Sequence, residues 1–128
     1  RYRAAHVALR ELLGEWLVVP AKNVPLEVGI YGKPFLRTLG RTGFGFNLSH
    51  SQDMALIGIG RELEVGVDLE VVREIEDCEA MAQEILSPSE LHQWRSVREP
   101  ERNLAFLVAW TRKEAVLKSL GAGFHLDP

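Results

Sequence analysis

Two hydrophobic periodicities divide this chain, and their order restricts its fold class. Apolar residues recur at helical spacing from Leu9 to Leu17, and Pro20 follows as a stop. The spacing then becomes that of strands in LEVGIY, FGFNLS, MALIGIG and VGVDLE, which lie between residues 26 and 70. Helical spacing returns over residues 76–86 and 101–120, and Gly121 ends the last helix. We therefore predict an α+β fold, with a helix leading each half and short strands between.

The tetrapeptide SPSE, residues 87–90, predicts a further helix start. Ser87 is placed to be the N-cap, Pro88 suits the first helical position, and Glu90 can reach back to the N-cap amide.

Composition sets the class of protein. With 128 residues, of which 46% are hydrophobic and 26% charged, the chain suits one modest core and is neither disordered nor membrane-spanning. The net charge of −3 gives no reason to expect nucleic acid as a partner. A single cysteine, Cys78, excludes an intrachain disulfide and a cysteine-based zinc cluster, so we expect a cytoplasmic protein. The chain starts at Arg1 without Met, and we expect it to be an excerpt of a longer polypeptide.

Two carboxylates share one face of the predicted strand VGVDLE. Val67 and Leu69 point to one side, whereas Asp68 and Glu70 point to the other. One interpretation is a half-buried strand with a solvated acidic face. The other is a site for a hard cation, which needs a third oxygen ligand and an anionic substrate.

The last helix offers that third ligand. In WTRKEAVLK, the residues Trp110, Glu114 and Lys118 share one helix face with Leu107. Glu114 therefore lies at the edge of an apolar face. The alternative is an ordinary surface pair of Glu114 with Lys118.

The segment FNLSHS concentrates hydrogen-bonding side chains after an apolar strand. Asn47, Ser49, His50 and Ser51 could bind phosphate, or they could satisfy the backbone of a turn. A hydrolase triad of Ser49, His50 and Asp53 is rejected, since sequence neighbours rarely reach that geometry and no GxSxG motif is present.

In their order along the chain, GKP, FNLSHS, GVDLE and WTRKEAVLKSLGAG resemble the Sfp-type 4′-phosphopantetheinyl transferases. The resemblance runs from about Leu9 to the end of the chain. It implies two α/β halves related by a pseudo-twofold, each with a helix packed on a short antiparallel sheet, and a monomer that is an internal pseudo-dimer. Residues 1–60 would form the coenzyme A 3′-phosphate and adenine side, and residues 61–128 the metal and catalytic side of one intertwined unit. The family has further strands before Arg1 and after the GAG stretch, which leaves open that the fold is incomplete at both chain ends.

The resemblance also implies a reaction. Enzymes of this family act as holo-[acyl-carrier-protein] synthases: they transfer 4′-phosphopantetheine from coenzyme A to a serine of an apo acyl- or peptidyl-carrier protein and release 3′,5′-ADP. Mg²⁺ is the expected metal, with Mn²⁺ as the alternative. By this resemblance the metal ligands are Asp68, Glu70 and Glu114, with Glu114 also the base and Lys118 on the diphosphate. The expected coenzyme A contacts are Arg10 and Lys33 at the 3′-phosphate, Pro34 near the adenine, Asn47, Ser49 and His50 at the phosphates and ribose, and Lys113 and Lys118.

Two other functions are consistent with the same residues. One is a catalytically silent carrier-binding homologue, or an incomplete fragment of such an enzyme. The other is an unrelated Mg²⁺-dependent phosphohydrolase, which leaves GKP and SHS without a role. Three departures from the family pattern bear on phosphate binding and carrier choice: Ala122 between the last two glycines, Gln83-Glu84 at a basic position, and Ile85-Leu86 in place of an aromatic pair.

Overall fold

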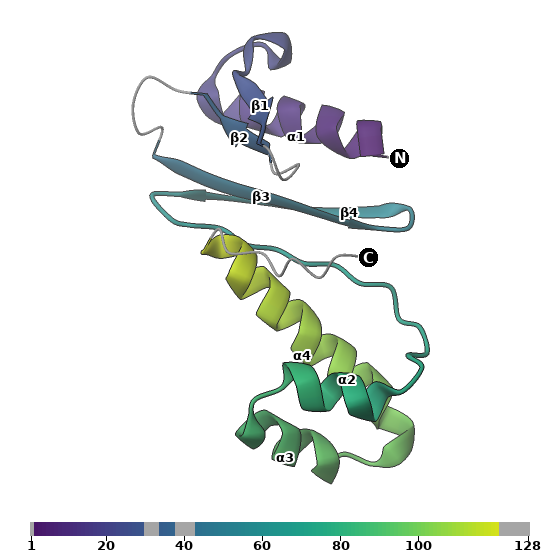
Figure 1. Ribbon diagram of the computed structural model, residues 1–128. Coiled ribbons are helices and arrows are strands. Elements are labelled where there is room, and N and C mark those ends of the chain that lie inside the picture. Colours follow the sequence, from purple (N-terminus) through teal and green to yellow (C-terminus); the bar gives the residue numbers. More distant parts are fainter. Residues whose placement is uncertain (1, 30–33, 38–42, 121–128) are drawn as a thin grey trace.

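The computed structural model describes residues 2–29, 34–37 and 43–120, and the predicted α+β fold is confirmed there (Figure 1). Its elements, in chain order, are α1 (Tyr2–Leu17), the 3₁₀ helix η1 (Ala21–Asn23), β1 (Leu26–Val28), β2 (Pro34–Leu36), β3 (Phe44–Ser51), β4 (Met54–Arg61), α2 (Cys78–Ile85), α3 (Pro88–Ser96) and α4 (Glu99–Ser119). The described strands form two antiparallel pairs, β1 with β2 and β3 with β4.

The β3–β4 hairpin has two chemically different faces. Its register runs from Phe44 opposite Arg61 to Ser51 opposite Met54. The alternate apolar residues of both strands pack against Leu9 and Leu13 of α1, which are fully buried; these strand residues are Phe46, Leu48, Ile57 and Ile59. The helix therefore covers one face of the hairpin (Figure 1). The other face carries small and polar side chains along β3, and two glycines followed by Leu56 and Met54 along β4.

The strand predicted over residues 26–31 is shorter in the structure. β1 ends at Val28 and pairs with β2, with Leu26 opposite Leu36. Residues 30–33, which include Lys33 and part of the predicted GKP turn, lie outside the described residues. Arg10 of α1 holds the start of β1, since its guanidinium donates to the carbonyl of Val24 at 2.6 Å and to that of Leu26 at 3.4 Å.

A second core joins the three helices of the other half. Ala82, Leu86, Trp94 and Phe106 are buried together, and Trp110 packs against them. The predicted capping box is confirmed: the Ser87 hydroxyl accepts from the Glu90 amide, and the Ser87 amide donates to the Glu90 carboxylate at 2.7 Å. Of the two α4 residues predicted to lie in a core, Trp110 packs against this cluster beside Phe106, and Leu107 is also buried.

None of the helices in the described part of the chain is both long and apolar enough to cross a membrane.

Candidate active site

The acidic motif lies in an extended segment, residues 64–75, and the strand predicted for VGVDLE is wrong. The segment crosses the hairpin face opposite α1, between the hairpin and α4 (Figure 1). Glycines make room for it there: a Cβ added at Gly58 would come within 2.8 Å of the side chains of Val65 and Val67. The segment is therefore extended like a strand, but its backbone is not paired with any strand in the described part of the chain.

Side chains of β3 take the place of the missing backbone partners. The amide of Val67 donates to Asn47 Oδ1 at 3.0 Å, and the amide of Leu69 donates to Ser49 Oγ at 3.2 Å. The amide of Val71 donates to Ser51 Oγ at 3.2 Å. A strand pattern in sequence reports extended backbone, but it does not say whether the amides meet another backbone or side chains.

The cluster predicted to bind phosphate or cap a turn therefore has a third role, which sequence reasoning missed. The signal was present: Gly45, Asn47, Ser49 and Ser51 alternate with the apolar residues of β3, so they share the face turned away from α1. Asn47 and Ser49 are buried on that face.

Asp68 is buried and bonded on one carboxylate oxygen. Its Oδ1 receives the Lys118 ammonium at 2.5 Å and the Ser49 hydroxyl at 3.1 Å. The Ser49 hydroxyl also accepts from the Leu69 amide and from Lys118 Nζ, both at 3.2 Å, so its one donor and two acceptor positions are all in use. The Asp68 side chain is 5% exposed, and its second oxygen, Oδ2, is enclosed without a hydrogen-bond partner.

The same segment meets α4 at Gly66. A Cβ at this position would lie 2.5 Å from the amide nitrogen of Ser119 and closer still to the carbonyl oxygen of Ala115. The backbones of segment and helix are therefore in direct contact, which brings Asp68 beside the α4 residues Glu114 and Lys118.

Glu114 is half-buried and lies in the field of both other acids. Burial raises its pKa above the usual range, and the charges of Asp68 and Glu70 raise it further, whereas Lys118 opposes them. Its Oε1 is enclosed and has no hydrogen-bond partner. The structure thus brings the three predicted carboxylates within electrostatic reach of one another, although they come from two distant parts of the sequence.

These carboxylates fit a hard divalent cation in their chemistry. Mg²⁺ takes oxygen ligands, and both Asp68 Oδ2 and Glu114 Oε1 are buried acceptors without a donor. No three acidic, histidine or cysteine side chains of residues 2–29, 34–37 and 43–120 are arranged as a ready metal cluster, however. In the structure the Asp68 carboxylate is paired with the positive charge of the Lys118 ammonium.

The remaining predicted contacts lie in different places. Pro34 begins β2 and lines a groove of about 720 Å³, together with aromatic side chains of β2 and β3 and with Glu62 and Glu64. His50 is exposed on β3. Lys113 pairs with Glu90 of α3 at 2.8 Å.

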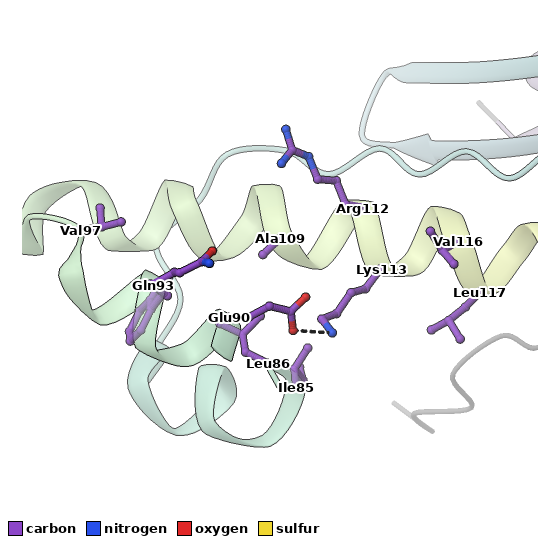
Figure 2. A pocket seen from close by; sticks show the side chains of 11 residues that line it. Ile85, Leu86, Glu90, Gln93, Val97, Ala109, Arg112, Lys113, Val116 and Leu117 are labelled. Atoms are coloured by element: carbon purple, nitrogen blue, oxygen red, sulfur yellow. Dashed lines mark ion pairs between the residues drawn. The ribbon is translucent and has the colours of Figure 1, made fainter. Parts of the chain in front are cut away.

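That ion pair spans a second groove, of about 660 Å³, between α3 and α4 (Figure 2). Its apolar lining includes Ile85, Leu86, Trp94, Val97, Val116 and Leu117. The Lys113 ammonium, followed by the Ser87 amide, lowers the pKa of Glu90 to about 2. The sequence indicated the cap at Glu90 but not this partner, which comes from 23 positions further along the chain.

Comparison with known proteins identifies the family. Residues 64–128 match the 4′-phosphopantetheinyl transferase superfamily, and the chain belongs to that family. The 4′-phosphopantetheinyl transferase HetI of Nostoc sp. is 36% identical over 124 residues, covering 96% of this chain and 52% of the relative. The 4′-phosphopantetheinyl transferase AcpT of Salmonella typhi is 37% identical over 121 residues, covering 93% and 59%. The 4′-phosphopantetheinyl transferase gsp of Aneurinibacillus migulanus is 29% identical over 135 residues, covering 98% and 54%.

The predicted family membership is thereby confirmed. The chain spans about half the length of the curated relatives that it matches.

Proposed function

We propose that the protein transfers 4′-phosphopantetheine from coenzyme A to a serine of an apo carrier protein, with Mg²⁺, and releases 3′,5′-ADP. The observation that carries this proposal is the meeting of Asp68 with Glu114 and Lys118 across the contact at Gly66. The family and the names of its relatives support the same reaction.

In this reaction the serine oxygen forms a bond to the β-phosphorus of coenzyme A. The bond from that phosphorus to the bridging oxygen breaks, and 3′,5′-ADP leaves with the electron pair. The serine proton passes to a base, for which Glu114 is the candidate. A carboxyl group whose pKa is raised by burial and by neighbouring acids is a better proton acceptor near neutral pH than an ordinary one.

Asp68, Glu70 and Glu114 would hold the cation. When bound, Mg²⁺ would offset the negative charge of the diphosphate as charge develops on the leaving group. Lys118 lies one helical turn after Glu114 and brings a second positive charge to the same place. It is well placed to contact phosphate oxygens.

The coenzyme A contacts remain predictions. Arg10 uses two of its five N–H donors on the carbonyls of Val24 and Leu26, which leaves donors for a 3′-phosphate. Ser49 has no hydrogen-bonding capacity left over, so its contribution to phosphate binding would be through the backbone. The expected set also contains Lys33, Pro34, Asn47, His50, Lys113 and Lys118.

The acceptor would be a carrier protein, and the groove between α3 and α4 is the candidate surface for it. Its residue Lys113 directly precedes Glu114, so the groove adjoins the carboxylates along the same helix. Val116 lines the groove and is 58% exposed, so it can be changed with little effect on the core. Val116→Asp should raise the KM for the carrier and leave the KM for coenzyme A unchanged.

The decisive experiment incubates the protein with coenzyme A, Mg²⁺ and an apo-carrier and records the mass of the carrier. Addition of a phosphopantetheine mass that chelation by EDTA prevents supports the proposal. A silent homologue gives no addition, and a phosphohydrolase gives free hydrolysis products instead. Asp68→Asn should abolish transfer, whereas Glu76→Gln, an exposed acid outside the site, should leave it unchanged.

A further inference from the structure

Side chains hold the backbone of the acidic segment at five alternate positions. Three are the amides of Val67, Leu69 and Val71, which bond to Asn47, Ser49 and Ser51 of β3. The other two are the carbonyl of Arg73 and the amide of Ile75, which both bond to Asn103 of α4. The spacing matches the period of two of extended backbone.

Asn103 of α4 holds the far end of the segment with both ends of its amide. Its Nδ2 donates to the carbonyl of Arg73 at 2.6 Å, and its Oδ1 accepts from the amide of Ile75 at 2.9 Å. The hairpin and the last helix therefore share one segment, and each fixes its own part of it.

The two carboxylates lie between these fixed points. Asp68 is flanked by the held amides of Val67 and Leu69, and Glu70 by those of Leu69 and Val71. Because the segment has no strand partner among the described residues, loss of one of these side chains removes a bond that no sheet ladder described there replaces. If the backbone beside Asp68 or Glu70 is no longer fixed, that side chain can turn away from the site while the two hydrophobic cores stay intact.

We propose that Asn47, Ser51 and Asn103 are positioning residues, which set where Asp68 and Glu70 point and thereby tune their affinity for the divalent cation. This inference rests on the proposed function, because it takes both acids as cation ligands. Groups that orient metal ligands from behind typically change metal affinity by about 10- to 100-fold when removed.

Ser51 allows the sharpest test, because threonine and valine have nearly the same shape and differ in the hydroxyl. Ser51→Thr keeps an acceptor for the Val71 amide, and Ser51→Val removes it. We expect Ser51→Val to weaken Mn²⁺ binding, measured by calorimetry, by about 10-fold or more relative to Ser51→Thr. Hydrogen exchange of the Val71 amide should accelerate in the same variant.

Ser96 provides the matched control. It is an exposed serine at the end of α3 whose hydroxyl donates to the carbonyl of Gln93, so Ser96→Val and Ser96→Thr should bind Mn²⁺ alike. A second test uses Asn103→Leu, which should weaken Mn²⁺ binding and expose the Ile75 amide to exchange while leaving the amide of Val67 protected.

Two outcomes separate this inference from the proposed function. If Asp68→Asn binds Mn²⁺ as tightly as the unchanged protein, the metal site itself is wrong. If Asp68→Asn loses Mn²⁺ but Ser51→Val and Ser51→Thr bind it equally, only the positioning role is overturned. All titrations are made well below each variant's Tm, so a loss of stability alone does not change the comparison.

Discussion

Gly66 offers the most direct test of how the acidic segment meets the last helix. Among the described glycines only Gly43 has a positive φ, so alanine at position 66 fits the local backbone and any cost is steric. The atoms that its methyl group would meet are the Ala115 carbonyl oxygen and the Ser119 amide nitrogen. Both belong to helical backbone, which cannot move aside as a side chain can.

Gly58→Ala is the matched comparison on the other side of the segment. Its methyl group would meet methyl carbons of Val65 and Val67 at 2.8 Å, and these can shift by small rotations. Overpacking costs about 1–3 kcal/mol, and the change from glycine to alanine returns about 0.4–1 kcal/mol through the unfolded chain. We expect a net loss of about 2 kcal/mol or more for Gly66→Ala and of about 0–1 kcal/mol for Gly58→Ala.

Urea denaturation measures both free energies of unfolding. For a chain of this size the larger loss corresponds to a fall in Tm of about 6–8 °C. Gly66→Ala should also weaken Mn²⁺ binding, because the segment carrying Asp68 must move away from Lys118. Equal losses for the two variants, or a loss below about 1 kcal/mol for Gly66→Ala, would refute the backbone contact on which the site depends.

Three further predictions concern single side chains. The raised pKa of Glu114 gives stability that is present below pH 4.5 and is lost as pH rises through the folded pKa. Glu114→Gln should therefore raise the Tm of the metal-free protein at pH 7 and flatten the fall of Tm above pH 4.5. A lower Tm for the variant at pH 7 would contradict this. The lowered pKa of Glu90 acts in the opposite sense, with stability present above pH 4.5 and lost as pH falls through about 2. Since the Lys113 pair is partly exposed, Glu90→Gln should cost only about 0.5–1 kcal/mol at pH 7 and clearly less at pH 2, measured by denaturation at both values. Trp94→Phe removes the indole donor to the Arg102 carbonyl, which keeps its backbone partner within α4. Unfolding should therefore become easier by about 0.5–1.5 kcal/mol, and an unchanged midpoint would show that the bond is dispensable.

The sequence was sufficient to predict features that depend on neighbours along the chain. The helix start at Ser87 follows from a motif of four residues, and the apolar stripe of α4 follows from its periodicity. The order of α1, the strands β3 and β4 and the later helices was equally clear, because each change of period is visible in a short window, whereas β2 was not predicted. These features need no knowledge of the tertiary fold.

Features that depend on distant partners were predicted less well. VGVDLE has the composition of a strand, yet the amides of Val67 and Leu69 bond to side chains 20 positions earlier, which no local pattern encodes. The family resemblance identified Asp68 and Glu114 as partners, but it did not indicate that Lys118 would bond to Asp68 directly. Nor did it indicate that Asn47 and Ser49 would be committed to the segment.

The construction of α4 has a mechanical consequence. Phe106 anchors the helix in one core, while Lys118 meets the acidic segment about 18 Å further along the axis at the usual rise per residue. No proline or glycine interrupts residues 101–119, so this stretch behaves as one rigid arm. A tilt of about 5° at the anchored end would move the far end by about 1.5 Å, which is half the length of a hydrogen bond. A small change of packing around Phe106 can thus misalign Lys118 and Asp68, although Phe106 contacts neither of them.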